Sequence, residues 1–393
     1  MKVRRVIMVV LDSAGVGEMP DAASYGDSGA NTLGNLALRV GSLDLPNLAA
    51  MGLGRVLSLP GVSPEAFRSP GGWGRCAVAS PGKDTITGHW EMMGIILERP
   101  FPTYPQGFPL EVMETFARTA GKPALGNKVA SGTEIIQELG DLHVLTGRLI
   151  VYTSADSVFQ VAAHESVLPP EALWGLCRAM RDALTGPHAV GRVIARPFTG
   201  TSGNYRRTVR RKDFPAAPPH ETVLDRLVDS GIAVTGIGKI GDLFAMRGIS
   251  RSVPTRSNLE GIRALEDFAQ NGLGFCFANL IDFDMLYGHR NDVEGYWGAL
   301  REFDQGLERL LKALRPGDYL AVTADHGCDP TFPGTDHTRE YVPILARGGK
   351  READLGTRAT LADLGAFACQ ALGVPWEGPG QGFLGDLEGE GDT

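Results

Sequence analysis

Continuous apolar runs alternate with amphipathic segments along most of this 393-residue chain. The runs RVIMVVL at 5–11 and GFCFANLID at 274–282 are apolar nearly throughout, which is typical of strands covered on both faces. Segments such as 32–40 and 258–272 instead repeat apolar residues at helical spacing. Strands that alternate with helices predict an α/β fold, with a mostly parallel sheet and helices on both of its faces.

Two proline-rich patches, at 98–109 and 213–220, interrupt this alternation. A chain of this length exceeds the usual size of one hydrophobic core. We therefore predict a discontinuous core of residues 1–98 and 219–393, interrupted by a smaller α/β domain at 99–218. Within the insert, the pattern predicts helices at 110–121 and 168–186, a strand–loop–strand at 148–163 and a strand at 189–198. In the core, CAVAS at 76–80 is a further candidate strand.

Composition narrows the class of protein. A net charge of −8 argues against a general nucleic-acid binder. The one basic run, RRTVRRK at 206–212, is either a solvated loop or a loop that faces phosphate. No stretch reaches the roughly 18 apolar residues that a membrane span needs. Five scattered cysteines without a CxxC pair fit a reducing cytosol, so we expect a cytoplasmic protein.

Three apolar strands, at 9–12, 279–289 and 321–326, run into acidic or histidine residues at their C-terminal ends, and the loop at 334–338 contains a further Asp-His pair. In open α/β sheets, sites form outside the carboxyl ends of the strands. We therefore expect one edge of the sheet to gather seven side chains from distant parts of the chain: Asp12, Asp282, Asp284, His289, Asp325, His326 and His337.

Carboxylates gathered in this way repel one another unless a positive charge compensates them. Arginines are one alternative. A mixture of Asp and His without Cys is also typical of two divalent cations, with Mn²⁺, Mg²⁺ and Zn²⁺ as options, and two such ions can clamp a phosphoryl transfer. A single Asp after a strand is commonly a helix N-cap, and periodicity does not separate Asp282 from Asp284. Within these clusters Asp282, Asp329 and Asp336 are discounted as ligands, and Asp336 either shapes a turn or orients the imidazole of His337.

The loop GKDTITGHWE at 82–91 contains two candidate nucleophiles, Thr85 and Thr87. A hydroxyl is a weak nucleophile until a base or a metal activates it. Thr87 fits equally well as an N-cap of the following helix, which leaves Thr85 as the freer candidate. His89 is interpreted as a packing or hydrogen-bonding residue rather than a metal ligand.

Five stretches together resemble the prokaryotic phosphopentomutases of the alkaline phosphatase superfamily: VLDSAGVGEMPDA, GKDTITGHWEMMG, NKVASGTEII, IVYTSADSVFQVAAHE and TADHGCDPTFPGTDHTREYVP. The resemblance covers essentially the whole chain. The metal motifs alone indicate only the superfamily. The threonine loop, YTSADS and GRVIARPF restrict the resemblance to the phosphopentomutases within it. It implies an alkaline phosphatase-like α/β core that binds metal, interrupted by a cap domain.

The resemblance also implies roles for individual residues. One Mn²⁺ is expected at Asp12, Asp325 and His326 with Thr85 bridging to it, and a second at Asp284, His289 and His337. The active phosphoryl group is expected on Thr85. Substrate binding is expected at Ser154, Asp156, Arg192, Arg207 and Lys239, with Arg206, Arg210 and Arg211 as alternatives to Arg207.

The implied enzyme is an isomerase that interconverts ribose or 2-deoxyribose 1-phosphate and 5-phosphate through a phosphothreonine and a bisphosphate intermediate. Its expected partners are small pentose phosphates and a sugar bisphosphate activator, without nucleic acid or membrane. The oligomeric state stays open. The alternatives are a metal-dependent phosphatase or phosphodiesterase of the same superfamily, a phosphoglycerate mutase, and a non-enzymatic binding protein.

Overall fold

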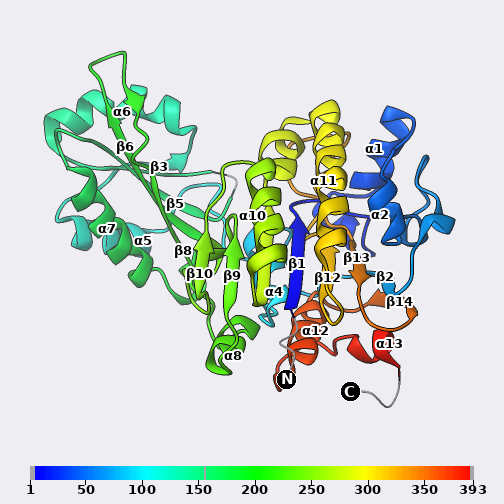
Figure 1. Ribbon diagram of the computed structural model, residues 1–393. Helices are drawn as coiled ribbons and strands as arrows, with labels where there is room; N and C mark the ends of the chain where they lie inside the picture. Colours follow the sequence, from blue (N-terminus) through cyan, green and yellow to red (C-terminus); the bar gives the residue numbers. More distant parts are fainter. Residues whose placement is uncertain (1–4, 155, 390–393) are drawn as a thin grey trace. The chain divides into compact units, whose positions relative to one another are not determined.

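The computed structural model describes residues 5–154 and 156–389 of the chain. Two compact units are present. The first combines the residues up to Pro100 with those from Pro218 onward, and the second is Phe101–Ala217. Each unit has its own sheet and its own helices (Figure 1).

The first unit is built on an eight-stranded sheet. All neighbouring strands are parallel except β13, which runs antiparallel to both of its neighbours. The predicted mostly parallel sheet is therefore confirmed. In spatial order the strands are β10 (Arg251–Val253), β9 (Val234–Ile237), β11 (Gly274–Leu280), β1 (Arg5–Leu11), β12 (Tyr319–Thr323), β13 (Val342–Arg347), β2 (Gly71–Cys76) and β14 (Glu352–Arg358).

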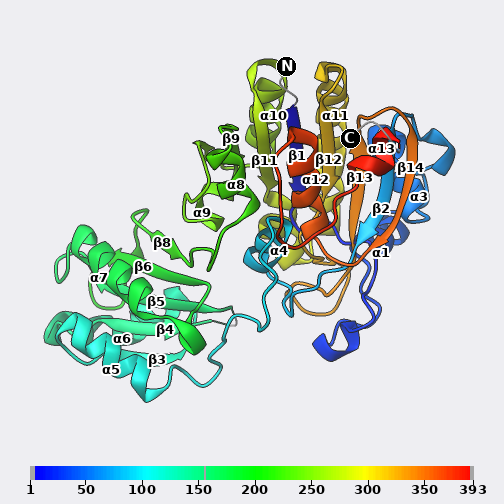
Figure 2. The ribbon, with the colours of Figure 1, turned by 90° about the horizontal axis from the view of Figure 1, so that it is seen from below.

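The central strands β1, β11 and β12 are buried along their whole length, as expected for strands covered on both faces. Figure 2 shows the sheet between two layers of helices. Helix α11 (Val293–Ala313) packs against α10 (Asn258–Asn271) and also contacts α1 (Thr32–Val40) and α2 (Pro46–Ala50). Helix α12 (Ala362–Leu372) contacts α4 (Thr85–Met92) and α8 (Val223–Asp229). Three short helices complete the unit: α3 (Leu53–Val56), α9 (Ile240–Leu243) and α13 (Leu384–Glu388).

The strand predicted at 76–80 is wrong, because the strand in this region is β2 at Gly71–Cys76. Its sequence, GGWGRC, lacks the branched residues that usually indicate a strand. Glycine is required there for close packing. A Cβ at Gly74 would lie 2.6 Å from the Gly356 carbonyl oxygen of the neighbouring strand.

The second unit has a six-stranded sheet. Its strands are β3 (Leu125–Val129), β4 (Ile150–Thr153), β5 (Val158–His164), β6 (Arg192–Thr199), β7 (Arg206–Arg207) and β8 (Lys212–Pro215), with β8 paired to β6. Helices α5 (Leu110–Ala120) and α7 (Pro170–Ala183) share one apolar core with this sheet, and α6 (Gly132–Thr146) shares another. The helices and strands predicted inside the insert are thus confirmed, with ends shifted by up to three residues.

Membrane spans are long, apolar helices. Among the helices within residues 5–154 and 156–389, none combines the length and the apolar character that such a span requires.

Candidate metal centre

Three parallel strands deliver acidic residues to one edge of the first sheet. In the register of the sheet, Leu11 of β1 lies beside Leu280 of β11, and Val10 lies beside Thr323 of β12. The chain leaves all three strands at this edge. Asp12 follows β1 directly, Asp284 lies in the helical turn after β11, and Asp325 lies just beyond β12. The strand ends therefore bring together side chains that are hundreds of residues apart in sequence.

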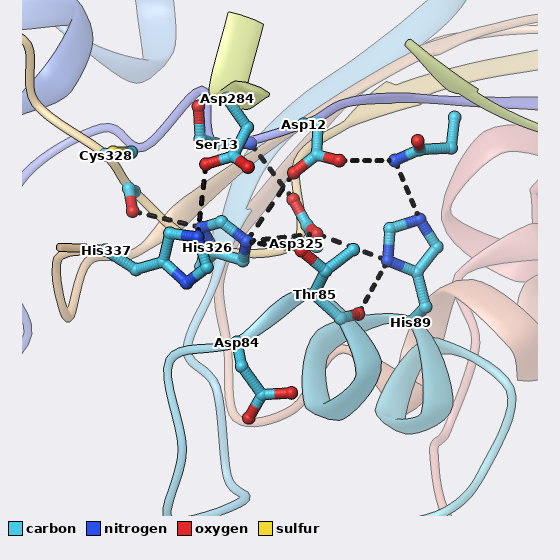
Figure 3. A network of polar contacts seen from close by, with 12 residues as sticks. Asp12, Ser13, Asp84, Thr85, His89, Asp284, Asp325, His326, Cys328 and His337 are labelled. Carbon is cyan, nitrogen blue, oxygen red and sulfur yellow. Dashed lines mark hydrogen bonds and ion pairs between the residues drawn. The ribbon is translucent and has the colours of Figure 1, made fainter. Parts of the chain in front are cut away.

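The first cluster consists of Asp12, Asp325 and His326, all fully buried. One ligand atom from each side chain lies within 4.8 Å of the others. The Nε2 atom of His326 is 3.5 Å from Asp12 Oδ1 and 3.3 Å from Asp325 Oδ2 (Figure 3). Two carboxylate oxygens and an imidazole nitrogen thus face one point.

The second cluster is centred on Asp284. His337 Nε2 is 3.1 Å from Asp284 Oδ1, and His289 Nε2 is 3.4 Å from Asp284 Oδ2. The two imidazole Nε2 atoms are 3.1 Å apart, a distance that suits a shared proton or a shared cation. His326 also lies within ligand distance of Asp284 and His337, so this imidazole stands between the two clusters.

Cys328 was not anticipated at this centre. Its sulfur lies within 4.8 Å of ligand atoms of Asp284 and His289. Burial raises the pKa of the Cys328 thiol to about 11, although a hydrogen bond with His289 acts to lower it. The sequence did contain a signal, because Cys328 follows His326 by two residues in the ligand-bearing loop.

The electrostatics of the first cluster fit a divalent cation. Burial, together with the charges of Asp325 and Asp284, raises the pKa of Asp12 well above its usual range. Asp12 Oδ1 and Asp325 Oδ2 are buried and receive no hydrogen bond from any residue that the structure describes. Oxygen and imidazole donors of this kind suit hard or borderline cations.

In the second cluster, the pKa shifts favour an ionised carboxylate and protonated imidazoles. Despite burial, which opposes the change, the charge of His337 and hydrogen bonds from both histidines lower the pKa of Asp284 well below its usual range. Hydrogen bonds to Asp284 and Cys328 raise the pKa of His289 to about 11. Because metal ligands must be deprotonated, a cation displaces these protons when it binds.

Thr85 is the first residue of α4, and its Oγ1 lies 3.3 Å from His326 Nε2. The residue before it, Asp84, caps the helix by accepting a hydrogen bond of 3.0 Å from the Thr87 backbone N–H. The alternative that Thr87 is the N-cap is therefore wrong. Thr87 donates its hydroxyl proton to Asp84 instead, at 2.5 Å, which leaves Thr85 as the hydroxyl beside the first cluster.

Arg339, which the sequence did not single out, supports the loop that leads to Thr85. Its guanidinium donates to three buried backbone carbonyls, those of Val78, Ser80 and Gly82, at 2.6–2.8 Å. It also pairs with Asp21 at 3.1 Å. A forked cation suits this task because it can satisfy several acceptors at once.

Glu340 is a second unanticipated residue, and only 1% of its surface is exposed. Its carboxyl group accepts hydrogen bonds from the backbone N–H groups of Gly17 and Thr32 and from the hydroxyls of Thr32 and Thr338. These groups belong to the segments after Asp12 and His337. Burial raises the pKa of Glu340 to about 7.

The three discounted aspartates have other partners. Asp282 accepts a hydrogen bond from the Asn258 backbone N–H at 2.7 Å. Asp329 accepts from the Asn31 backbone N–H and the Asn35 amide. Asp336 accepts from the backbone N–H of His337 at 2.9 Å and pairs with Lys83 at 3.1 Å. Of the two alternatives for Asp336, these contacts favour the one in which it shapes the turn.

The residues predicted to bind substrate lie at different positions: Arg192 and Arg207 are near opposite ends of one strand of the second unit, and Lys239 is in the first unit. Arg192 pairs with Val158 where β6 begins, and Ser154 and Asp156 lie between β4 and β5, shortly before Val158. Arg207 pairs with Phe198 near the other end of β6, six residues or roughly 20 Å along the strand. In the first unit, Lys239 precedes α9, and its positive charge acts to lower the pKa of Asp12 against the larger effect of burial.

Arg207 lines an open pocket of about 510 Å³ in the second unit. Other side chains around this pocket are Thr133, Arg196, Tyr205, Arg206 and Arg211. Arg210 instead pairs with Glu165 at 3.6 Å and is not among the pocket residues. The pocket is thus lined by three arginines of the basic run, Arg206, Arg207 and Arg211, together with Arg196, and it excludes Arg210.

Comparisons with known proteins agree with this geometry. The family model described as "Metalloenzyme superfamily" matches residues 4–376. A phosphopentomutase from Acetivibrio thermocellus is 53% identical over 388 residues, which cover 98% of this chain and 100% of that protein. A phosphopentomutase from Symbiobacterium thermophilum is 55% identical over 390 residues, covering 98% and 99%.

Among solved structures, the PH0037 protein from Pyrococcus horikoshii matches with a TM-score of 0.50 and 14% identity, covering 96% of this chain and 99% of that one. This match supports the fold. The superfamily and the clusters together support the use of a divalent metal. The resemblance inferred from the sequence motifs is confirmed, and the chain belongs to the phosphopentomutase family of the metalloenzyme superfamily.

Proposed function

We propose that this enzyme interconverts ribose or 2-deoxyribose 1-phosphate and 5-phosphate by two-metal phosphoryl transfer through a phosphorylated Thr85. A pentose bisphosphate is the intermediate, and the second phosphate of that intermediate returns to Thr85. The observation that carries the proposal is the position of Thr85 Oγ1, 3.3 Å from a histidine shared by two candidate metal clusters, in a member of this family.

Two cations, which we propose to be Mn²⁺, would be held by Asp12, Asp325 and His326 and by Asp284, His289 and His337. When bound, such ions neutralise the charge of the transferring phosphoryl group and of the attacking and leaving oxygens. A donor set of carboxylates and imidazoles is compatible with Mn²⁺, as it is with other divalent ions of the first row. Cys328 lies close enough to the second set to affect which ion is preferred.

The chain's own residues supply the positioning. Thr85 lies at the N-terminus of α4, where the helix dipole favours a phosphate group on its hydroxyl. Asp84 fixes the start of this helix, and Arg339 fixes the preceding loop. A preset position of this kind reduces the entropic cost of reaching the transition state.

We propose that Ser154, Asp156, Arg192, Arg207 and Lys239 bind the pentose phosphate or a sugar bisphosphate activator. The pocket containing Arg196, Arg206, Arg207 and Arg211 supports a phosphate ligand for the second unit, because guanidinium groups bind phosphate with two parallel hydrogen bonds.

All five cysteines are buried free thiols, which supports the proposed cytoplasmic location.

Exclusion of water from the phosphothreonine is proposed to separate this mutase from a phosphatase, since an open phosphothreonine would hydrolyse. The test has two parts. The purified protein is digested and its peptides are analysed by mass spectrometry, and phosphate is expected on Thr85 in the 82–91 peptide. Ribose 5-phosphate is then incubated with the Mn²⁺ enzyme. Isomerisation with conserved phosphoester is the expected result, whereas stoichiometric free phosphate would identify a phosphatase.

A further inference from the structure

Two fully buried polar side chains, His89 and Asn279, connect the segment of Thr85 with two carboxylates of the metal centre. His89 Nδ1 lies 2.9 Å from the Thr85 carbonyl oxygen and 3.2 Å from Asp325 Oδ2. Asn279 Nδ2 lies 3.2 Å from His89 Nε2 and 3.0 Å from Asp12 Oδ2. Figure 3 shows His89 on its helix, one turn after Thr85, with its ring directed toward Asp325.

The partners determine which atoms carry protons. The Thr85 carbonyl only accepts hydrogen bonds, so His89 Nδ1 carries a proton and donates it to that oxygen. The same nitrogen lies 3.2 Å from Asp325 Oδ2, a charge contact rather than a second hydrogen bond. The Asp12 carboxylate likewise requires the NH₂ group of Asn279 as its donor. The second proton of that amide then points to His89 Nε2, which accepts it. The amide of Asn279 therefore donates to both Asp12 and His89, and the imidazole of His89 donates to the Thr85 carbonyl.

This link occupies one oxygen of Asp12 and leaves the other for the centre. Asn279 engages Asp12 Oδ2, while Oδ1 lies on the side of His326. Asp325 is held in a similar way, because its Oδ1 accepts from the Ser13 backbone N–H at 3.1 Å while Oδ2 lies between His89 and His326. These contacts restrict the rotation of both carboxylates, because in each one an oxygen that faces away from the centre accepts a hydrogen bond. Metal-ligating side chains are commonly oriented by such hydrogen-bond partners.

A buried histidine can also serve packing alone, and His143 in the second unit is an example. His143 is likewise fully buried, with Nδ1 2.7 Å from the Arg148 carbonyl oxygen and Nε2 2.8 Å from the His164 backbone nitrogen. Both of these partners are backbone groups. His89 differs because one partner is a candidate metal-ligand carboxylate and another is the carbonyl of the candidate nucleophile.

We propose that His89 and Asn279 are positioning residues that set the carboxylates of Asp12 and Asp325, together with the helix of Thr85, for cation binding and phosphoryl transfer. The inference rests on the proposed function in taking Thr85 as the nucleophile. Neither residue touches the reacting phosphoryl group in this assignment. Their effect passes through the ligands and the helix that they contact.

The experiment compares wild type with His89→Leu, His89→Asn and Asn279→Ala, and uses His143→Leu as the matched control. Mn²⁺ binding is measured from the electron paramagnetic resonance signal of the free ion, and kcat and KM are measured with ribose 5-phosphate. His89→Leu is expected to weaken Mn²⁺ binding about 10- to 100-fold and to lower kcat by a similar factor, with KM unchanged. Asn279→Ala, which keeps the imidazole in the core, is expected to change both quantities in the same direction.

His89→Asn is expected to recover most of the loss, because its amide can place an N–H where Nδ1 stood. His143→Leu is expected to lower Tm while keeping wild-type Mn²⁺ affinity and kcat. The inference is overturned if His89→Leu and Asn279→Ala bind Mn²⁺ as wild type does, if His89→Asn is no better than His89→Leu, or if His143→Leu shows the same loss. Failure of the wild-type enzyme itself to bind Mn²⁺ would reject the proposed function as well, so the two failures are distinguishable.

Discussion

Thr85 Oγ1 and His326 Nε2 lie 3.3 Å apart, although 241 positions separate the two residues in sequence. The same Nε2 atom is 3.3 Å from Asp325 Oδ2. The candidate nucleophile and a candidate metal-ligand carboxylate therefore converge on one imidazole nitrogen. Activation of a hydroxyl by a cation requires this proximity of hydroxyl and ligand.

Replacement of Thr85 by Ala should reduce mutase turnover to background and remove phosphate from the 82–91 peptide. The metal-ligand set stays intact, so two Mn²⁺ per chain should still bind, as measured by metal analysis after dialysis. Thr87→Ala is the control, because Thr87 bonds to Asp84 and its loss should affect stability more than chemistry. A phosphorylated Thr85→Ala protein would contradict the assignment of the nucleophile.

Replacement of Asp284 by Asn should reduce bound Mn²⁺ from two ions to one per chain. Asp284 contacts both His289 and His337, and it is the carboxylate in each candidate ligand group that contains one of these histidines. Loss of one ion removes several kcal/mol of charge stabilisation, and kcat should fall about 10³-fold. Asp282→Asn is the matched control, since Asp282 bonds to the Asn258 backbone. Equal metal loss in both variants would contradict the choice of Asp284.

Metal affinity should rise with pH. Hydrogen bonds to Asp284 and Cys328 raise the pKa of His289 to about 11, and the pKa of His337 is also raised, with the charge of Asp284 overcoming the opposing effect of burial. A cation must displace these protons, so Mn²⁺ binding should tighten progressively from pH 6 to pH 9. Isothermal titration calorimetry in buffers of different ionisation enthalpy measures the protons released. Binding without proton release would show that the two imidazoles are not ligands.

Much of the candidate centre could be predicted from sequence because strand polarity is readable. Asp12 and Asp325 each come just after a continuous apolar run, and parallel strands that end together place the next residues of each segment at one edge of the sheet. The same rule did not separate Asp282 from Asp284. That choice depends on the helical turn at Phe283–Tyr287, which directs Asp284 toward His337 while Asp282 bonds to Asn258.

The residues that sequence reasoning missed act through burial and through contacts across the fold. Glu340 comes after a threonine and an arginine in a polar stretch, and nothing local indicates that it is fully buried. Asn279 is one polar position in an apolar strand. The prediction placed the strand at 76–80 instead of at β2, because the glycines of β2 do not indicate a strand. These glycines allow the backbones of β13 and β14 to approach closely, and both of those strands lie far away in the sequence.

Replacement of Arg339 by Lys should destabilise the fold by about 2–4 kcal/mol. A lysine cannot reach the three carbonyls that the guanidinium satisfies, and each buried acceptor left without a donor costs about 1–3 kcal/mol. Urea unfolding measures the change. Arg75→Lys is the control, because Arg75 is partly exposed and bonds to the Thr357 hydroxyl, so a change within about 0.5 kcal/mol is expected. Equal effects of the two substitutions would contradict the supporting role of Arg339.

Glu340 should make the stability of the metal-free protein fall as pH rises. Burial raises its pKa from 4.5 to about 7, so the folded state binds this proton more tightly than the unfolded state does. The stabilisation is therefore fully present below pH 4.5 and is lost as pH rises through 7. A rise of the pKa from 4.5 to about 7 corresponds to roughly 3 kcal/mol.

Glu340→Gln should remove this dependence. A glutamine can accept from the backbone N–H groups of Gly17 and Thr32 with its oxygen, and the threonine hydroxyls can accept from its NH₂. The unfolding free energy of the variant minus that of wild type, measured with EDTA present, should therefore increase by roughly 3 kcal/mol between pH 4.5 and pH 8. Subtraction cancels every other titrating group that the two proteins share. A difference that stays constant over this range, or that decreases, would show that Glu340 is already ionised in the folded protein at low pH.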